Sequence, residues 1–121
     1  MKQYTVKVYD DRIEWYNQKG QCHREDGPAI EWANGTKEWY INGQYHREDG
    51  PAVEYADGTK FWYINGQLHR EDGPAVEYAN GTKEWYINGR KLTEQEFNNR
   101  KASCNGKIIE VDGKKYRLEQ L

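Results

Sequence analysis

The chain has 121 residues, which is enough for one domain with a modest core. Its 18 basic and 20 acidic side chains nearly cancel, and Lys and Arg are spread evenly, which argues against duplex nucleic acid as a partner. No stretch approaches the roughly 20 apolar residues of a membrane span, and the N-terminus lacks the apolar run of a signal peptide. We therefore expect a cytoplasmic protein with no membrane span.

Residues 1–19 have the pattern of an N-terminal hairpin that caps whatever follows. A turn at Asp10-Asp11 places four apolar residues on one face, namely Val6, Val8, Ile13 and Trp15. We expect this face to continue the apolar face of the next segment.

Three nearly identical copies of a 23-residue unit follow, over 20–42, 43–65 and 66–88, and a fourth begins before residue 92. Each copy contains HREDGPA, at 23–29, 46–52 and 69–75. Exact periodicity of this length is typical of an array whose units bury their faces by stacking on neighbours. Residues 20–92 are therefore predicted to form one continuous array.

The first turn of each unit is predicted at Asn34-Gly35, Asp57-Gly58 and Asn80-Gly81, because these dipeptides favour two-residue type I′ turns between strands. This register sets Ile30 opposite Trp39 and Glu31 opposite Glu38. It predicts one face that carries Ile30, Val53 and Val76 with Trp39, Trp62 and Trp85. The Tyr row at 40, 63 and 86 is then expected on the other face.

A second Asn-Gly ends each unit, at 42-43, 65-66 and 88-89. A two-residue turn there sets Tyr45 opposite Tyr40 and His46 opposite Trp39. The same register predicts the charge pairs Arg47–Glu38 and Glu48–Lys37. The pattern leaves open whether His-Arg-Glu forms a true third strand or only links successive hairpins.

Residues 93–121 are predicted to cap the array with a helix and a hairpin. Thr93 and Glu96 form a capping-box pattern, so a short helix is expected over roughly 94–103. A hairpin around Asp112-Gly113 would pair Ile109 with Tyr116 and Glu110 with Lys115.

Neither a metal site nor a catalytic site is predicted, and no cofactor is expected. His23, His46 and His69 lie in different units, so a single ion would not collect them, and Cys22 and Cys104 lack zinc-site spacing. Every reactive side chain of the array is repeated, whereas catalysis needs a unique, convergent cluster. We therefore expect that the protein is not an enzyme.

The frame of Asn-Gly, His, Gly, Asp-Gly and aromatic positions at a period of 23 resembles the MORN repeat. It is most similar to the MORN-like variant with HREDGPA that recurs in bacteriophage and bacterial proteins, over roughly residues 8 to 92. The resemblance implies a mainly β fold: a single-layer antiparallel β-sheet of repeated hairpins, here with a short C-terminal helix and a final hairpin as cap. It also implies attachment to protein or lipid rather than chemistry.

These observations predict a non-enzymatic, repeat-type binding module, phage or bacterial in origin, that engages a host or self protein, with homo-oligomeric packing as a companion. The alternative is a phage-encoded scavenger or inhibitor that binds a nucleotide-like host defence signal in the host cytoplasm. The candidate binding residues share one predicted polar face: Arg24, Arg47, Arg70, Glu31, Glu54, Glu77, Tyr40, Tyr63 and Tyr86. Their other interpretation is lateral charge pairing and solubility.

Overall fold

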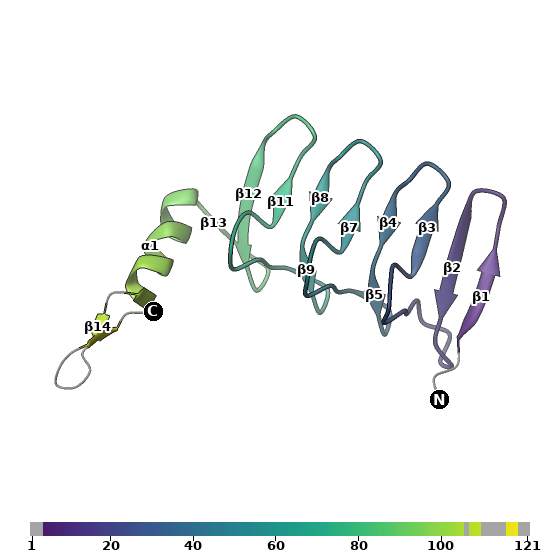
Figure 1. Cartoon of the computed structure of the whole chain (residues 1–121), viewed down its shortest axis with the longest axis horizontal. Coiled ribbons are helices and arrows are strands. Elements are labelled where there is room, and N and C mark those ends of the chain that lie inside the picture. The colour runs from purple at the N-terminus through teal and green to yellow at the C-terminus, as the bar shows by residue number, and fades with distance from the viewer. Residues whose placement is uncertain (1–3, 106, 110–115, 119–121) are drawn as a thin grey trace. The chain divides into compact units, whose positions relative to one another are not determined.

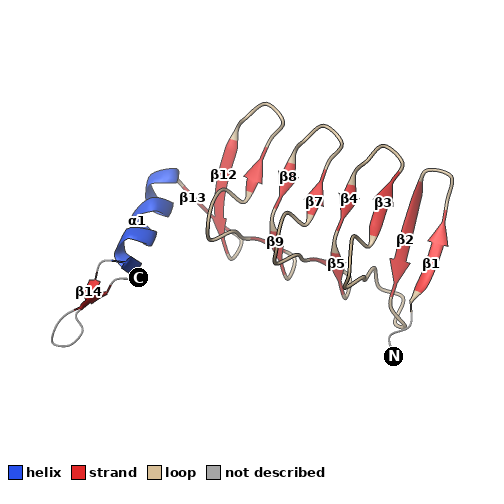
Figure 2. Ribbon diagram, viewed as in Figure 1, coloured by secondary structure: helices blue, strands red, loops and turns tan. Residues whose placement is uncertain are grey.

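The structure is a computed structural model that describes residues 4–105, 107–109 and 116–118. The chain divides into two compact units, one that ends at Arg90 and one that begins at Lys91. The fold is mainly β: the first unit is a single-layer antiparallel sheet of repeated hairpins, and the second contains one short helix and a hairpin (Figure 1, Figure 2).

The main sheet of the first unit runs in the order β1-β2-β3-β4-β7-β8-β11-β12, and every pairing in it is antiparallel. Two shorter hairpins, β5–β6 and β9–β10, lie outside this sheet. The bounds are β1 (Thr5–Val8), β2 (Arg12–Tyr16), β3 (Ile30–Trp32), β4 (Lys37–Glu38), β5 (Tyr40–Ile41), β6 (Gln44–Tyr45), β7 (Val53–Glu54), β8 (Lys60–Phe61), β9 (Tyr63–Ile64), β10 (Gln67–Leu68), β11 (Val76–Glu77), β12 (Lys83–Ile87) and β13 (Arg90–Leu92).

The tip of each long hairpin is a three-residue loop, so the predicted type I′ turn at Asn34-Gly35 is wrong. The Trp32 N–H donates to the Thr36 carbonyl (2.8 Å), and the Gly35 N–H donates to the Trp32 carbonyl (3.0 Å). Gly35 has φ +98°, whereas Asn34 is not in the left-handed region. This is a type I turn followed by a left-handed glycine, the other common use of Asn-Gly in hairpins.

The longer loop shifts the strand register by one residue from the prediction. Ile30 pairs with Glu38 rather than Trp39, and Glu31 pairs with Lys37 rather than Glu38. The same offset recurs in the later copies, where Val53 pairs with Phe61 and Val76 with Glu84. A slip of one residue moves each side chain to the opposite face of the sheet.

The predicted assignment of the aromatic rows to the two faces is therefore wrong. Tyr40, Tyr63 and Tyr86 follow the row of Ile30, Val53 and Val76, as the contact between Tyr63 and Phe61 indicates (6.4 Å between ring centroids). We call this side the Tyr face. Trp39, Trp62 and Trp85 lie on the other side, which we call the grooved face.

The second Asn-Gly forms the type I′ turn that the sequence predicts. Asn42 has φ +50° and Gly43 has φ +83°, and Tyr40 pairs with Tyr45 as predicted. The His46 N–H donates to the Trp39 carbonyl (3.1 Å), which confirms that these two residues lie opposite each other.

Beyond His46 the segment is a link between repeats and not a third strand. The Arg47 N–H donates to the Tyr63 carbonyl of the next short hairpin, β9–β10 (3.1 Å), so the chain has already left the β5–β6 hairpin. Glu48 lies 3.2 Å from the His46 ring. Two predicted pairs are consequently wrong, Arg47–Glu38 and Glu48–Lys37.

The core is a narrow layer built from the residues that follow each Gly-Pro. Ala52 and Val53 are 0% and 2% exposed, and the equivalent residues are also buried: Ala29, Ile30, Ala75 and Val76. Complete burial of a Val side chain stabilises a fold by about 1.5–3 kcal/mol, so three such rows are a substantial contribution for a thin sheet. The side chains of the Trp-Tyr pairs that follow are half-buried around this layer: Trp39, Tyr40, Trp62, Tyr63, Trp85 and Tyr86.

Successive hairpins of the array are joined by the same side-chain bonds. The Nδ1 atoms of His23, His46 and His69 accept the backbone N–H of Asn42, Asn65 and Asn88 in the following Asn-Gly turn, at 2.9, 3.0 and 2.9 Å. The hydroxyl oxygens of the buried Thr36 and Thr59 accept the N–H of Ala56 and Ala79, each at 3.1 Å. Stability therefore comes from bonds between neighbours, as in other repeat arrays.

The N-terminal hairpin has the predicted register, with Val6 paired with Trp15 and Val8 with Ile13. Its face is not the one expected, because Ile13 pairs with Glu31, whose neighbour Ile30 points to the Tyr face. The β1–β2 hairpin therefore adds Trp15 to the grooved face.

In the second unit, helix α1 (Glu94–Asn105) begins at the predicted capping box. The Thr93 N–H donates to Glu96 (2.9 Å), and the Glu96 N–H donates to the Thr93 hydroxyl (3.0 Å). Strands β14 (Lys107–Ile109) and β15 (Tyr116–Leu118) confirm the pairing of Ile109 with Tyr116. The predicted turn and the Glu110–Lys115 pair lie outside the described residues.

Candidate functional site

Each arginine of the HREDGPA segments lies flat on a tryptophan of the grooved face. The guanidinium carbon of Arg47 is 3.8 Å from the ring centre of Trp39. Arg24 lies on Trp15 and Arg70 on Trp62, both at 3.9 Å. A delocalised guanidinium stacks well on an indole ring, which a lysine ammonium would not do with the same geometry.

The same guanidinium is held by polar groups of its own segment. Arg47 Nε donates to Asp49 (2.9 Å), and Nη1 donates to the Pro51 carbonyl (3.1 Å) and to Glu54 (3.0 Å). The other two copies repeat all three bonds, including the pairs Arg24–Glu31 and Arg70–Glu77. The predicted Arg and Glu residues thus pair with each other in every repeat.

The glycine of each segment leaves room for this guanidinium. A Cβ atom on Gly50 would lie 2.9 Å from Cζ of Arg47, and one on Gly73 would lie 2.9 Å from Cζ of Arg70. Gly50 does not have a positive φ, so contact with Arg47 and not backbone strain explains why a glycine fits here. The arginine is therefore enclosed between an indole ring and the loop backbone.

The histidines are held in one tautomer. Since His46 Nδ1 accepts the Asn65 N–H, the ring proton lies on Nε2, which donates to Glu48 (3.2 Å). His23 and His69 make the same pairs of contacts. Within the part of the chain that the structure describes, no three His, Cys, Asp or Glu side chains lie together as a metal site.

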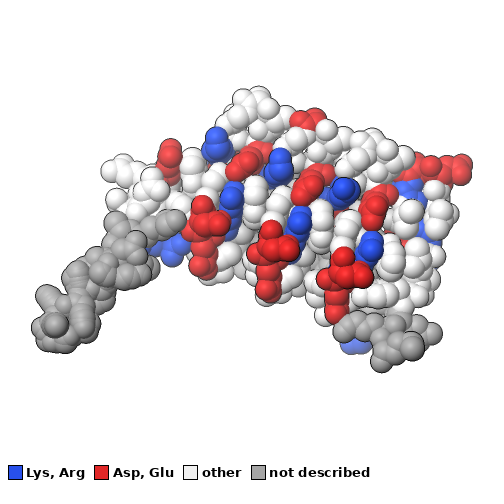
Figure 3. All heavy atoms as spheres, in the orientation of Figure 1, with Lys and Arg blue, Asp and Glu red and all other residues white. Residues whose placement is uncertain are grey.

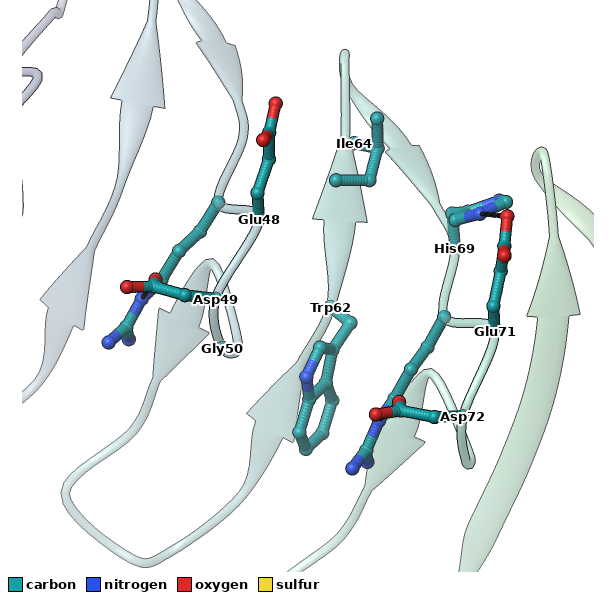
Figure 4. Close-up of a pocket in the computed structure, with 10 residues that line it drawn as sticks. Glu48, Asp49, Gly50, Trp62, Ile64, His69, Glu71 and Asp72 are labelled. Atoms are coloured by element: carbon teal, nitrogen blue, oxygen red, sulfur yellow. Dashed lines mark hydrogen bonds and ion pairs between the residues drawn. The ribbon is translucent and has the colours of Figure 1, made fainter.

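Two grooves of the same construction lie between successive HREDGPA segments. The larger has a volume of about 800 Å³ and is lined by Arg47, Glu48, Asp49, Gly50, Trp62, Ile64, His69, Arg70, Glu71 and Asp72. The other, of about 460 Å³, lies one repeat earlier and is lined by Arg24, Glu25, Trp39, Ile41, His46, Arg47, Glu48 and Asp49. Figure 4 shows Trp62 and Ile64 between the segments that carry Glu48–Gly50 and His69–Asp72.

The floor of each groove is aromatic and carries an available donor. Arg70 covers one face of the Trp62 ring, and the segment of Asp49 and Gly50 lines the far side of the groove. Among the described residues, none accepts a hydrogen bond from Nε1 of Trp39 or Trp62, whereas Trp32 Nε1 donates to Glu38 (2.8 Å) on the Tyr face. Indole N–H groups in partly buried sites are usually bonded, so these two donors are suited to a bound acceptor.

The walls of the grooves are acidic. The side chains of Glu48, Asp49 and Glu71 are 81%, 88% and 75% exposed, whereas that of Arg47 is 22% exposed. The hydrogen bond from Arg47 lowers the pKa of Asp49, so this carboxylate is ionised at neutral pH. Acidic and basic side chains form columns that repeat along the sheet in Figure 3. In these grooves the arginine side chains are mostly buried, and the carboxylates of the walls are exposed to solvent.

The structure divides the predicted binding residues between two faces. Arg24, Arg47, Arg70, Glu31, Glu54 and Glu77 are together on the grooved face, joined as ion pairs. Tyr40, Tyr63 and Tyr86 are on the Tyr face instead, because of the register difference. Sequence reasoning did not select the tryptophan and isoleucine of the groove floor, although they alternate along the same short segments (Trp-Tyr-Ile).

The Tyr face carries a row of stacked aromatic rings and one carboxylate, that of Glu38, among them. Tyr45 stacks on Tyr63 with ring centres 4.9 Å apart and contacts Tyr40 at 4.6 Å. The Tyr40 hydroxyl donates to Glu38 (3.1 Å), and burial raises its pKa, with a smaller effect from Tyr45. In the second repeat Phe61 stands where Glu38 stands in the first. The two differ in charge, so this face is less regular than the grooved face.

Among the described residues, no helix has the length and apolar character needed to cross a bilayer. No family model, no curated protein and no solved structure matches the chain.

Proposed function

We propose that the chain is a non-enzymatic binding module that engages a protein partner through its grooved face. One observation carries the proposal: two grooves of the same composition recur at the same positions of successive repeats, each with a tryptophan floor and carboxylate walls. Equivalent sites along one face suit an extended contact, in which several weak interactions add. Partly buried tryptophan is also among the residues that dominate binding energy at interfaces.

The charges of the grooves favour a cationic partner over the alternative, a nucleotide-like ligand. A phosphate needs free guanidinium or ammonium groups, but each arginine here already bonds to two carboxylates and a carbonyl. An incoming phosphate would instead meet Glu48, Asp49 and Glu71. Like charges placed opposite each other oppose binding, whereas lysine and arginine side chains would be attracted.

The resemblance to MORN-like repeats supports a proposal about the source and the location of the protein. We infer a phage or bacterial protein that binds a host protein, or a second copy of itself, in the cytoplasm. The strict repetition of polar side chains supports binding without turnover, because a catalytic site needs one convergent cluster.

Affinity purification from host lysate tests the proposal, with the wild-type chain compared with Glu48→Gln plus Glu71→Gln. Both glutamates keep an acceptor for the neighbouring histidine after this change, so the fold is retained while two wall charges are lost. Asp10→Asn is the matched control, because Asp10 is exposed on the first hairpin, away from the grooves. A protein recovered by the wild type and the control but not by the double variant would support the proposal. A nucleotide that co-purifies, with no protein partner, would promote the alternative.

A further inference from the structure

The repeat spacing of the grooves indicates the conformation of the partner. Each repeat adds two strands to the main sheet, for example β3 and β4, then β7 and β8. Neighbouring strands are about 4.8 Å apart, so equivalent points in successive grooves are about 9.6 Å apart. Any chain that lies along the array must present side chains on one side at this interval.

A polyproline II helix has nearly this interval. It has three residues per turn and rises about 3.1 Å per residue, so every third side chain points the same way at about 9.3 Å. An extended β-strand fits less well, because residues three apart point to opposite faces although they are about 10 Å apart. In an α-helix, side chains seven residues apart are separated by about 10.5 Å, and the helix is about 10 Å wide.

The chemistry of the grooves also suits such a segment. A polyproline II helix makes no internal hydrogen bonds, so its carbonyl groups are available to donors such as the Nε1 groups of Trp39 and Trp62. Aromatic grooves receive its proline rings or aliphatic side chains in known recognition modes. The exposed carboxylates of Glu48 and Asp49 stand on the ridge between the two grooves, where the partner must cross.

From this match of spacing, donors and charge we propose that the grooved face binds a basic polyproline II segment of a partner protein, whose residues i and i+3 enter successive grooves. The proposal rests on the function proposed above and specifies the partner: a proline-rich segment with lysine or arginine every third residue. Its backbone crosses the ridge of Glu48 and Asp49, and its basic side chains pair with the wall carboxylates.

Isothermal titration calorimetry of the full chain with three synthetic peptides tests the proposal. The first peptide has four Pro-Pro-Arg units. The second has the same composition, but no two of its arginines are three or six residues apart. The third carries four arginines on an alanine-based helix. We expect the first to bind at least ten times more tightly than either of the others, because only it presents basic residues at the groove interval.

Variants of the chain test whether this binding uses the grooves. Glu48→Gln plus Glu71→Gln is expected to weaken the first peptide several-fold, whereas Asp10→Asn leaves its affinity unchanged. Trp62→Phe keeps a ring beneath Arg70 but removes the Nε1 donor, and we expect about a five-fold loss.

Equal affinity for the periodic and irregular peptides, tighter binding of the helical peptide, or no binding at all would each overturn the proposal. These outcomes are distinct from failure of the proposed function. If the lysate partner is still captured and is lost with the two glutamates, the binding function stands and only the polyproline II conformation is refuted.

Discussion

The enclosed position of Arg47 predicts how a substitution at Gly50 affects stability. Gly50→Ala places a methyl group 2.9 Å from Cζ of Arg47, and Trp39 blocks the opposite side at 3.8 Å from its ring centre. The guanidinium must leave its position to relieve this overlap. It then loses the stacking on Trp39 and the bonds to Pro51 and Glu54.

The size of the effect follows from these contacts. The stacking contributes about 1 kcal/mol. The bonds to the Pro51 carbonyl and to Glu54 contribute about 1 kcal/mol each after allowance for solvent. Asp49 is 88% exposed, so its bond to Arg47 adds little. Arg47→Ala should therefore cost about 3 kcal/mol, and Gly50→Ala about 2 kcal/mol, because a displaced arginine keeps part of its packing.

A double-mutant cycle checks the reasoning, with free energies of unfolding from urea denaturation followed by circular dichroism. Once Arg47 is Ala, the methyl group at residue 50 has nothing to displace. We therefore expect the double variant to be no less stable than Arg47→Ala alone. If the two changes add instead, to about 5 kcal/mol, then the glycine does not serve the arginine and the argument is refuted.

Three further predictions concern the turns, the joints between repeats and the carboxylates. Gly66→Ala should cost about 1–2 kcal/mol in urea denaturation, because Gly66 has φ +81°, and an unchanged midpoint would contradict the type I′ turn. His46→Leu should fold, but its free energy of unfolding should fall by about 1 kcal/mol, since the N–H of Asn65 loses its acceptor. If the wild type binds a metal ion stoichiometrically and this variant does not, the structural role of His46 is contradicted. Arg24 and Arg47 lower the pKa values of Asp26 and Asp49, so the stability from these pairs is present above the ordinary aspartate pKa of about 3.9 and is lost as the pH falls below it. Thermal denaturation between pH 7 and pH 2.5 measures this loss, and Asp49→Asn should reduce it; an unchanged acid dependence would contradict the assignment.

The repeat period, the antiparallel hairpins, the Asn42-Gly43 turn and the capping box at Thr93 were predictable because each depends on local chemistry. The register at Asn34-Gly35 was not, because the same dipeptide serves two-residue and three-residue loops. The difference lies partly in Thr36, which is buried and whose hydroxyl accepts the Ala56 N–H of the next repeat. That contact is long-range, and a single unit considered alone does not reveal it.

The same uncertainty in register limited the prediction of the candidate site. One residue of register decides whether the tyrosines or the tryptophans share a face with the HREDGPA segments, so the predicted site combined two faces. The arginines were predicted on the same face as Glu54 and Tyr40, and the structure keeps them beside the glutamates but stacks them on the tryptophans of the opposite row. Arg47 bonds within its own segment and to Glu54, because the chain bends toward Tyr63 of the next short hairpin immediately after His46. The alternation of apolar and polar residues along the sequence does not predict such a bend.

The bonds between repeats also determine how such a chain can change in length. The bonds that join His23, His46 and His69 to the turns of their neighbours all span 19 residues, and those of Thr36 and Thr59 span 20. Duplication or loss of one whole 23-residue unit leaves every donor with an acceptor of the same kind, whereas an insertion of any other length does not. The array can therefore gain or lose whole units and keep these bonds, and each added unit brings one more groove.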